Sequence, residues 1–191
     1  MRCLSCHTLS WQTFCVDCRS RLLQPSVTKR QIGTLEVYSF FKYQHIEDLL
    51  LTKHTPQGFQ LYKALADISF RPFIANFIRE DNREITIIGI DETIKNGYSH
   101  VALLTHAMKH PQVKIQYAKL LAENKVTYAG KSLQYRLQNP RQFRYTGEEH
   151  IEAILVDDIV TTGTTLQEAK AVLQLQGVEV LFALTLADAK A

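Results

Sequence analysis

One segment, residues 154–165, limits the possible folds of this chain more strongly than any other. Its apolar, β-branched start predicts a buried strand over residues 151–156. Two adjacent carboxylates, Asp157 and Asp158, come next, followed by a turn in which four threonines surround one glycine. The apolar spacing then predicts a helix over residues 165–176. Strand, acidic pair, threonine-rich turn and helix are expected to form one unit of an α/β sheet.

The threonine-rich turn is suited to binding an anion. A phosphate binds where N–H and O–H donors converge, and the open N-terminus of a helix supplies N–H groups and the positive end of the helix dipole. The glycine allows a close backbone approach, and the threonine hydroxyls add donors. The acidic pair suits the two hydroxyls of a ribose, or Mg²⁺ held beside one. The predicted sugar phosphate site consists of Asp157, Asp158, Val160, Thr161, Thr162, Gly163, Thr164 and Thr165.

This segment resembles the phosphoribosyl diphosphate (PRPP) binding motif of type I phosphoribosyltransferases, in which two acids follow a strand and precede a threonine-rich loop. The resemblance implies PRPP as the ligand and Mg²⁺ as its companion. The segment is not a Walker A loop, because no Gly-Lys-[Ser/Thr] is present, and it is not a dinucleotide fingerprint, because no G-x-G-x-x-G is present. The alternative is an ordinary strand–turn–helix whose acids only cap the helix.

Two close cysteine pairs mark the other end of the chain: Cys3 with Cys6, and Cys15 with Cys18. This spacing is typical of a structural zinc site, in which four thiolates complete a tetrahedral shell. Two disulfides are the alternative, but the chain carries no secretory signal and resembles a cytosolic α/β protein. A redox role is less favoured, since the C-x-x-C occurs twice and outside a βαβ unit. We expect a small four-cysteine zinc module over residues 1–24, with the metal supplying its folding energy.

Alternating strands and helices predict the rest of the architecture. Arg19, Arg21, Lys29 and Arg30 are expected to form a basic linker after the zinc module. Expected strands are residues 34–43, 85–90, 113–117, 151–156 and 178–186, and expected helices are residues 45–53, 59–79, 98–109 and 165–176, the second with a break or kink at Pro72. This order predicts an α/β domain over residues 32–191, with a parallel sheet flanked by helices and right-handed crossovers. The loops beyond the carboxyl ends of the strands should then form one cleft.

The segment between residues 119 and 148 is expected to be long and irregular, with one helical turn. From residue 125 to 147 it contains no acid, and tyrosines are interleaved with its basic residues. Loops of this length are usually functional or disordered. Its cations suit the diphosphate of PRPP, as in the mobile lid of phosphoribosyltransferases, or a nucleic-acid backbone with tyrosines stacking on bases. A solvated basic surface is the third possibility. The nucleic-acid candidates are Lys125, Lys131, Tyr135, Arg136, Arg141 and Arg144, and Lys131 is also the candidate catalytic residue.

The combination of a four-cysteine module, a strand and helix pair, and a phosphoribosyltransferase-like core is similar to the ComF (ComFC) family of DNA-uptake competence proteins. Residues 38–43, 49–53, 96–100 and 131–143 carry the resemblance outside the two motifs. It implies a role in natural transformation, with single-stranded DNA entering the cytoplasm as a partner and a DNA translocase or helicase as another. The alternative function is an active phosphoribosyltransferase that acts on a base or another small acceptor. The residues do not decide whether PRPP is turned over.

One loop departs from the family pattern. Asp91 and Glu92 stand where the family usually has arginines, and two acids would repel a diphosphate unless Mg²⁺ bridges them. No run of 18 uncharged apolar residues is present, so no membrane span is expected. The expected location is the cytoplasm, with any attachment to the inner membrane made through partners.

Overall fold

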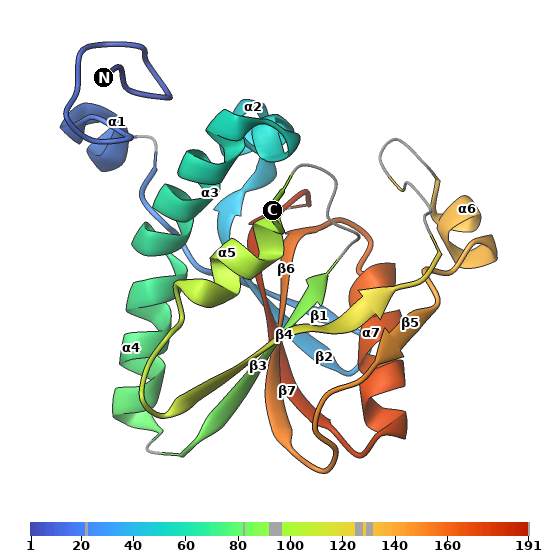
Figure 1. Cartoon of the computed structure of the whole chain (residues 1–191). Coiled ribbons are helices and arrows are strands. Elements are labelled where there is room, and N and C mark those ends of the chain that lie inside the picture. Colours follow the sequence, from blue (N-terminus) through green and yellow to red (C-terminus); the bar gives the residue numbers. More distant parts are fainter. Residues whose placement is uncertain (22, 82, 92–96, 125–127, 129–131, 191) are drawn as a thin grey trace.

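The computed structural model describes every residue except 22, 82, 92–96, 125–127, 129–131 and 191 (Figure 1). Its centre is a seven-stranded sheet in the order β1-β2-β7-β6-β3-β4-β5. The strands are β1 (Thr28–Ile32), β2 (Leu35–Lys42), β3 (Ile85–Asp91), β4 (Val113–Ala122), β5 (Phe143–Tyr145), β6 (Glu152–Val160) and β7 (Glu179–Asp188). From β2 to β4 every pairing in this order is parallel, which confirms the predicted parallel α/β sheet. Both edge strands run antiparallel to their neighbours.

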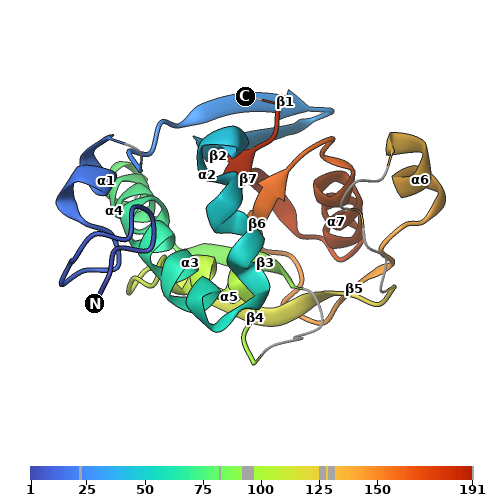
Figure 2. The same cartoon turned by 90° about the horizontal axis from the view of Figure 1, so that it is seen from above.

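Helices cover both faces of the sheet. α3 (Pro56–Ile68), α4 (Phe70–Glu80) and α5 (His100–His106) lie on one face, and α7 (Thr164–Leu175) lies on the other (Figure 2). α2 (Tyr43–Leu50) and the short 3-10 helix η1 (Leu51–His54) stand above the carboxyl ends of the parallel strands (Figure 1). Two buried apolar clusters fill the two interfaces, because the central strands are apolar on both sides.

The single helix predicted over residues 59–79 is two helices. The break lies at Ser69, between α3 and α4, and not at Pro72 itself. Pro72 occupies the first turn of α4, where a backbone N–H has no helical partner and its absence costs little. The proline therefore marks the start of a helix, and the chain breaks just before it.

The edge strands β1 and β5 were missed, and β4 was predicted too short. Lys29 and Arg30 belong to β1 and not to a linker, since β1 pairs with β2 along its whole length. β4 continues beyond residue 117 to Ala122, where it pairs with β5. The segment predicted as irregular therefore leaves the sheet as a strand, carries α6 (Leu133–Gln138) and returns as a strand. It extends away from the sheet edge beside α7 (Figure 1).

The N-terminal module contains α1 (Val16–Arg21) and packs against the α/β body. Its buried side chains Cys3, Phe14 and Cys18 belong to the same apolar cluster as Phe40 of β2. The division into residues 1–24 and 32–191 stays a prediction. In the part of the chain that the structure describes, no helix has the length and apolar character needed to span a bilayer.

Candidate functional site

A cavity of about 340 Å³ opens at the carboxyl ends of the central strands. It lies where the sheet, η1, α5, α6 and the start of α7 converge. Its lining residues are Tyr43, Lys53, Ile90, His100, Tyr128, Arg136, Arg141, Asp157, Asp158, Ile159, Thr161, Thr165 and Ala189. The fold thus brings part of the predicted sugar phosphate site together with Arg136 and Arg141. Both belong to the segment of residues 119–148, called the basic segment below. Three permanent cations face two carboxylates in this cavity.

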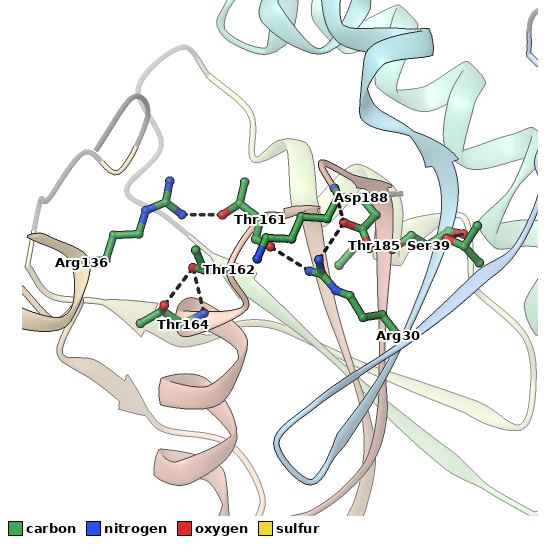
Figure 3. Close-up of polar contacts among 10 residues, drawn as sticks. Arg30, Ser39, Arg136, Thr161, Thr162, Thr164, Thr185 and Asp188 are labelled. Atoms are coloured by element: carbon green, nitrogen blue, oxygen red, sulfur yellow. Dashed lines mark hydrogen bonds and ion pairs between the residues drawn. The ribbon is translucent and has the colours of Figure 1, made fainter. Parts of the chain in front are cut away.

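The loop between β6 and α7 has the backbone conformation that an anion site needs. Gly163, at the N-cap of α7, has φ 84°, in the left-handed region that favours glycine. A Cβ atom there would lie 2.5 Å from Ile32 Cδ1, so the packing of β1 also demands glycine. The hydroxyls of Thr162 and Thr164 hydrogen bond to each other at 2.9 Å (Figure 3). The conformation of the loop is therefore fixed by hydrogen bonds among its own residues. Thr165, in the first turn of α7, lines the cavity.

The other predicted phosphate residues divide by role. Thr161 lines the cavity, and its hydroxyl accepts a hydrogen bond from Arg136 (Figure 3). Val160 is buried and packs in the core. Ligand contacts for the eight residues stay a prediction. Asp157, Asp158, Thr161 and Thr165 lie at the cavity, and Thr162, Gly163 and Thr164 form the turn into α7.

The two acids lie inside β6 and not after it. Both are buried, because β6 runs on to Val160 and pairs with β7 beside them. An oxygen of Asp157 accepts the backbone N–H of Asp158 at 2.8 Å. Asp158 Oδ2 lies 3.0 Å from Lys53 Nζ and 3.2 Å from His100 Nε2. Burial by itself raises the pKa of Asp158, but Lys53 and His100 outweigh it and hold that pKa well below its usual range.

A residue that sequence reasoning missed, Arg30, supports the loop between β6 and α7 from the edge of the sheet. We call this loop, residues 161–163, the phosphate loop after its predicted ligand. Its Nη2 donates to the carbonyl of Thr161 at 2.9 Å, and its Nη1 lies 3.1 Å from Asp188 Oδ1 (Figure 3). Asp188 is 3% exposed and ends β7. The only sequence signal was a basic residue in a β-rich stretch. Its pairing across the sheet depends on β7, which is more than 140 residues away in the chain.

The basic segment faces the cavity from the side of α6. The guanidinium groups of Arg136 and Arg141 lie over the Tyr128 ring, 5.4 and 4.7 Å from its centroid. Glu168 of α7, another residue missed from the sequence, accepts the backbone N–H of Arg141 at 3.0 Å and that of Gln142 at 2.7 Å. The segment is therefore tied to the helix that begins at the phosphate loop.

The remaining nucleic-acid candidates are spread out. Arg144 Nε lies 2.8 Å from Glu123 on an exposed surface, and Tyr135 lies in α6, half-buried. Lys125 and Lys131 lie outside the described residues. Nucleic-acid binding by these residues stays a prediction, as does a catalytic role for Lys131.

The expectation for Asp91 is wrong. Asp91 is the last residue of β3 and is 5% exposed. It accepts the Ser99 hydroxyl at 2.7 Å and the backbone N–H of Ala118 at 3.0 Å. Burial raises the pKa of Asp91, against these two hydrogen bonds. Asp91 therefore joins the start of α5 to β4 and does not face a diphosphate; Glu92 lies outside the described residues.

The four cysteines form one cluster. Their sulfur atoms all lie within 4.8 Å of one another, and all four are free cysteines in the structure. Backbone N–H groups of Ser5 and Cys15 donate to Cys3 Sγ at 3.4 and 3.3 Å. The hydroxyl of Thr8, 3.0 Å from Cys6 Sγ, lowers the pKa of Cys6 to about 6. Convergent sulfurs supported by N–H donors fit a tetrahedral metal ion.

No protein-family model and no curated protein matches this sequence. Among solved structures, the chain is similar to a hypoxanthine phosphoribosyltransferase from Staphylococcus aureus, with 17% identity and a TM-score of 0.42 over 64% of this chain and 62% of that one. It is also similar to an orotate phosphoribosyltransferase from Mycobacterium tuberculosis (15% identity, TM-score 0.41, 90% and 82% covered) and to an adenine phosphoribosyltransferase (14%, 0.41, 85% and 85%). The chain thus spans less than two thirds of the length of the first enzyme, and all three TM-scores lie below 0.5.

Proposed function

We propose that this chain binds PRPP or a related ribose phosphate in the cavity above β6. The observation that carries the proposal is the start of α7. A left-handed glycine opens the loop, Thr161 and Thr165 line the cavity, and Arg136 and Arg141 face them. Helix dipole, hydroxyls and guanidinium groups together form a site for a phosphate ester. The acids of β6 lie where they are able to accept the ribose hydroxyls.

Calorimetric titration of PRPP and of ribose 5-phosphate tests the proposal. Thr165→Val removes one hydroxyl at the start of α7 with little change of volume. Because a hydrogen bond to a charged group contributes about 1.5–3 kcal/mol, the Kd should rise by roughly tenfold or more. Thr146→Val is the matched control, since Thr146 is exposed and does not line the cavity. Equal affinity of the two variants would contradict the assignment of the site.

A pyrophosphate-release assay separates binding from turnover. Release of pyrophosphate from PRPP in the presence of a nucleobase would identify an active phosphoribosyltransferase. Binding without release would identify a PRPP-dependent binding protein. The proposal itself is the binding of the ribose phosphate, and Arg136 and Arg141 are the residues that would hold its diphosphate.

Zinc in the N-terminal module is part of the proposal. Cys3, Cys6, Cys15 and Cys18 would hold it as a closed four-thiolate site, which stabilises structure and leaves no open coordination position. The module then presents a rigid surface next to the α/β body.

One observation on that surface favours handling of single-stranded DNA. Trp11 is 98% exposed and Leu9 is 83% exposed, so the module presents two large apolar side chains to solvent. The guanidinium group of Arg19 lies near this tryptophan in space. Its Nη1 donates to the side-chain oxygen of Gln12, the residue after Trp11, at 3.1 Å. An exposed indole near a guanidinium group is a stacking platform of the kind that binds single-stranded nucleic acids. We therefore propose a cytoplasmic role in DNA uptake, with a translocase or helicase as a protein partner and any membrane attachment made through it.

Fluorescence anisotropy with labelled single-stranded DNA tests this second function. Tight binding should weaken with salt, with a slope of about −0.7 per phosphate contact on a double logarithmic plot. Trp11→Ala should weaken binding by about tenfold, since stacking contributes roughly 1–3 kcal/mol per base. Leu175→Ala is the control, because Leu175 is also strongly exposed, at the end of α7. Unchanged binding by the Trp11 variant would exclude the stacking platform.

A further inference from the structure

One of the two acids that line the cavity, Asp158, already has a cation beside it. Asp158 Oδ2 contacts Lys53 Nζ at 3.0 Å and His100 Nε2 at 3.2 Å. The side chains of Asp158 and His100 are each 10% exposed, and that of Lys53 is 27% exposed. Two donors on one carboxylate oxygen use both of its lone pairs. This ion pair is therefore largely withdrawn from water and from competing ions.

Hydrogen bonds from Tyr98 fix the backbone around Lys53. The hydroxyl of Tyr98 donates to the carbonyl of Lys53 at 2.5 Å and to that of Thr55 at 3.2 Å. A Cβ atom at Gly58 would lie 2.6 Å from this hydroxyl and 2.2 Å from the carbonyl of Thr52, so only glycine fits beneath the turn. The position of the ammonium group over β6 is thus a built feature of η1.

His100 is fixed from the opposite side. It begins α5 and packs edge-on against the ring of Tyr62, with 5.5 Å between the centroids. Tyr62 is 0% exposed, and burial together with the nearby Asp158 carboxylate raises the pKa of its hydroxyl well above the usual value. The start of α5 therefore places a ring nitrogen, and η1 an ammonium group, on one carboxylate.

Such an acid pair does not fit Mg²⁺. Magnesium needs near-octahedral oxygen ligands at about 2.0–2.1 Å and usually takes one or two carboxylates. Here Asp158 Oδ2 is held by two side-chain donors, and Asp157 Oδ1 accepts the backbone N–H of Asp158. A metal ion on these oxygens would have to displace the tethered ammonium group of Lys53 or lie against its charge.

We propose that Lys53 serves as the cation of this acid pair, so that the site binds a ribose 5-phosphate without a divalent metal ion. Lys53 neutralises Asp158, one of the two acids that line the cavity. The ammonium group lines the cavity and also attracts the anionic ligand. The inference rests on the proposed function, because it concerns the ligand of the same site.

The test is calorimetric titration of ribose 5-phosphate, a probe without the diphosphate that would carry its own Mg²⁺. Each protein is titrated once in excess EDTA and once in excess MgCl₂. The variants are Lys53→Met, Lys53→Arg and, as a control of equal charge change, Lys63→Met, since Lys63 is exposed on α3 and lies outside the cavity. Thermal melting of each variant shows whether it is folded.

The wild type and the Lys63 variant should bind equally well in both buffers, within about twofold. Lys53→Met should lose at least about tenfold in EDTA, because one charge-assisted contact and the neutralising charge are gone, and should recover part of this in MgCl₂. Lys53→Arg should keep binding in EDTA. A wild type that binds only with Mg²⁺ would overturn this inference and leave the proposed function intact. No binding by the wild type in either buffer would overturn both the inference and the proposed function. A well-folded Lys63→Met variant that lost as much affinity as Lys53→Met would have the same consequence.

Discussion

Replacing Arg30 by Met should show that the edge strand β1 supports the phosphate loop. The side chain of Arg30 is 24% exposed and pairs at 3.1 Å with Asp188, whose side chain is 4% exposed. Removing one partner of a buried pair costs about 3–5 kcal/mol, because the other charge stays buried. Asp188 keeps the backbone N–H of Lys190 at 2.8 Å, so we expect the lower end, about 3 kcal/mol.

The assay is urea unfolding followed by circular dichroism. With a slope of about 2 kcal/mol per molar urea, the midpoint of Arg30→Met should fall by about 1.5 M. The neighbouring residue provides the control: Lys29 pairs with Glu36 at 2.7 Å on the same strand, but the two side chains are 53% and 41% exposed. Surface ion pairs contribute little to stability, so Lys29→Met should have the same urea midpoint as the wild type. The Kd for ribose 5-phosphate should rise only in the Arg30 variant, since the carbonyl of Thr161 loses its donor.

A double variant separates the ion pair from the rest of the arginine. The double variant Arg30→Met, Asp188→Asn no longer has the unpaired buried carboxylate of Asp188. It should therefore regain part of the stability that Arg30→Met alone loses. Equal midpoints for the Arg30 and Lys29 variants would refute the reasoning. So would a double variant that is less stable than the sum of the two single changes predicts.

Three further outcomes are expected. Gly163→Ala should lower the free energy of unfolding by about 1–3 kcal/mol in urea unfolding, and by more than Gly97→Ala does. Both glycines have positive φ, but of the two only Gly163 would place a Cβ within 4 Å of a neighbouring atom. Equal losses in the two variants would contradict the role of that contact. A strong chelator should release one metal ion per chain and make all four cysteines reactive to a thiol reagent, whereas thiols that react equally without the chelator would argue against a metal site. The depressed pKa of Asp158 means that its ion pair stabilises the fold above the unfolded pKa near 3.8 and that this contribution is lost as pH falls below that value toward the folded pKa. The stability difference between the wild type and Lys53→Met should therefore be largest near neutral pH and shrink below about pH 4, and a difference independent of pH would contradict this.

Local patterns were sufficient for much of the fold. The apolar runs that became β3, β6 and β7 are long and β-branched, and Gly163 and the threonines mark the start of α7 whatever surrounds them. The ends of the strands were predicted less accurately than their centres. β6 includes both acids because β7 pairs beside them, and β4 continues past residue 117 because β5 returns to pair with it. Pairing with a distant strand has no local signal, so the lengths of these strands were underestimated.

The cavity shows the same division. Asp157, Asp158, Thr161 and Thr165 follow one another in the chain, and their residue types and spacing already indicate a sugar phosphate site. Lys53, His100 and Arg30 come from separate elements, and nothing near them in the chain indicates their partners. Only the crossing of α5 and η1 over β6 brings Lys53 and His100 to Asp158, and only the pairing of β1 with β2 brings Arg30 to the phosphate loop. The sequence by itself determined the parallel α/β class, the four-cysteine cluster and the phosphate loop, because each depends on residues close together in the chain. The tertiary structure alone decided which charges meet the acids, because that depends on contacts between segments far apart in the chain.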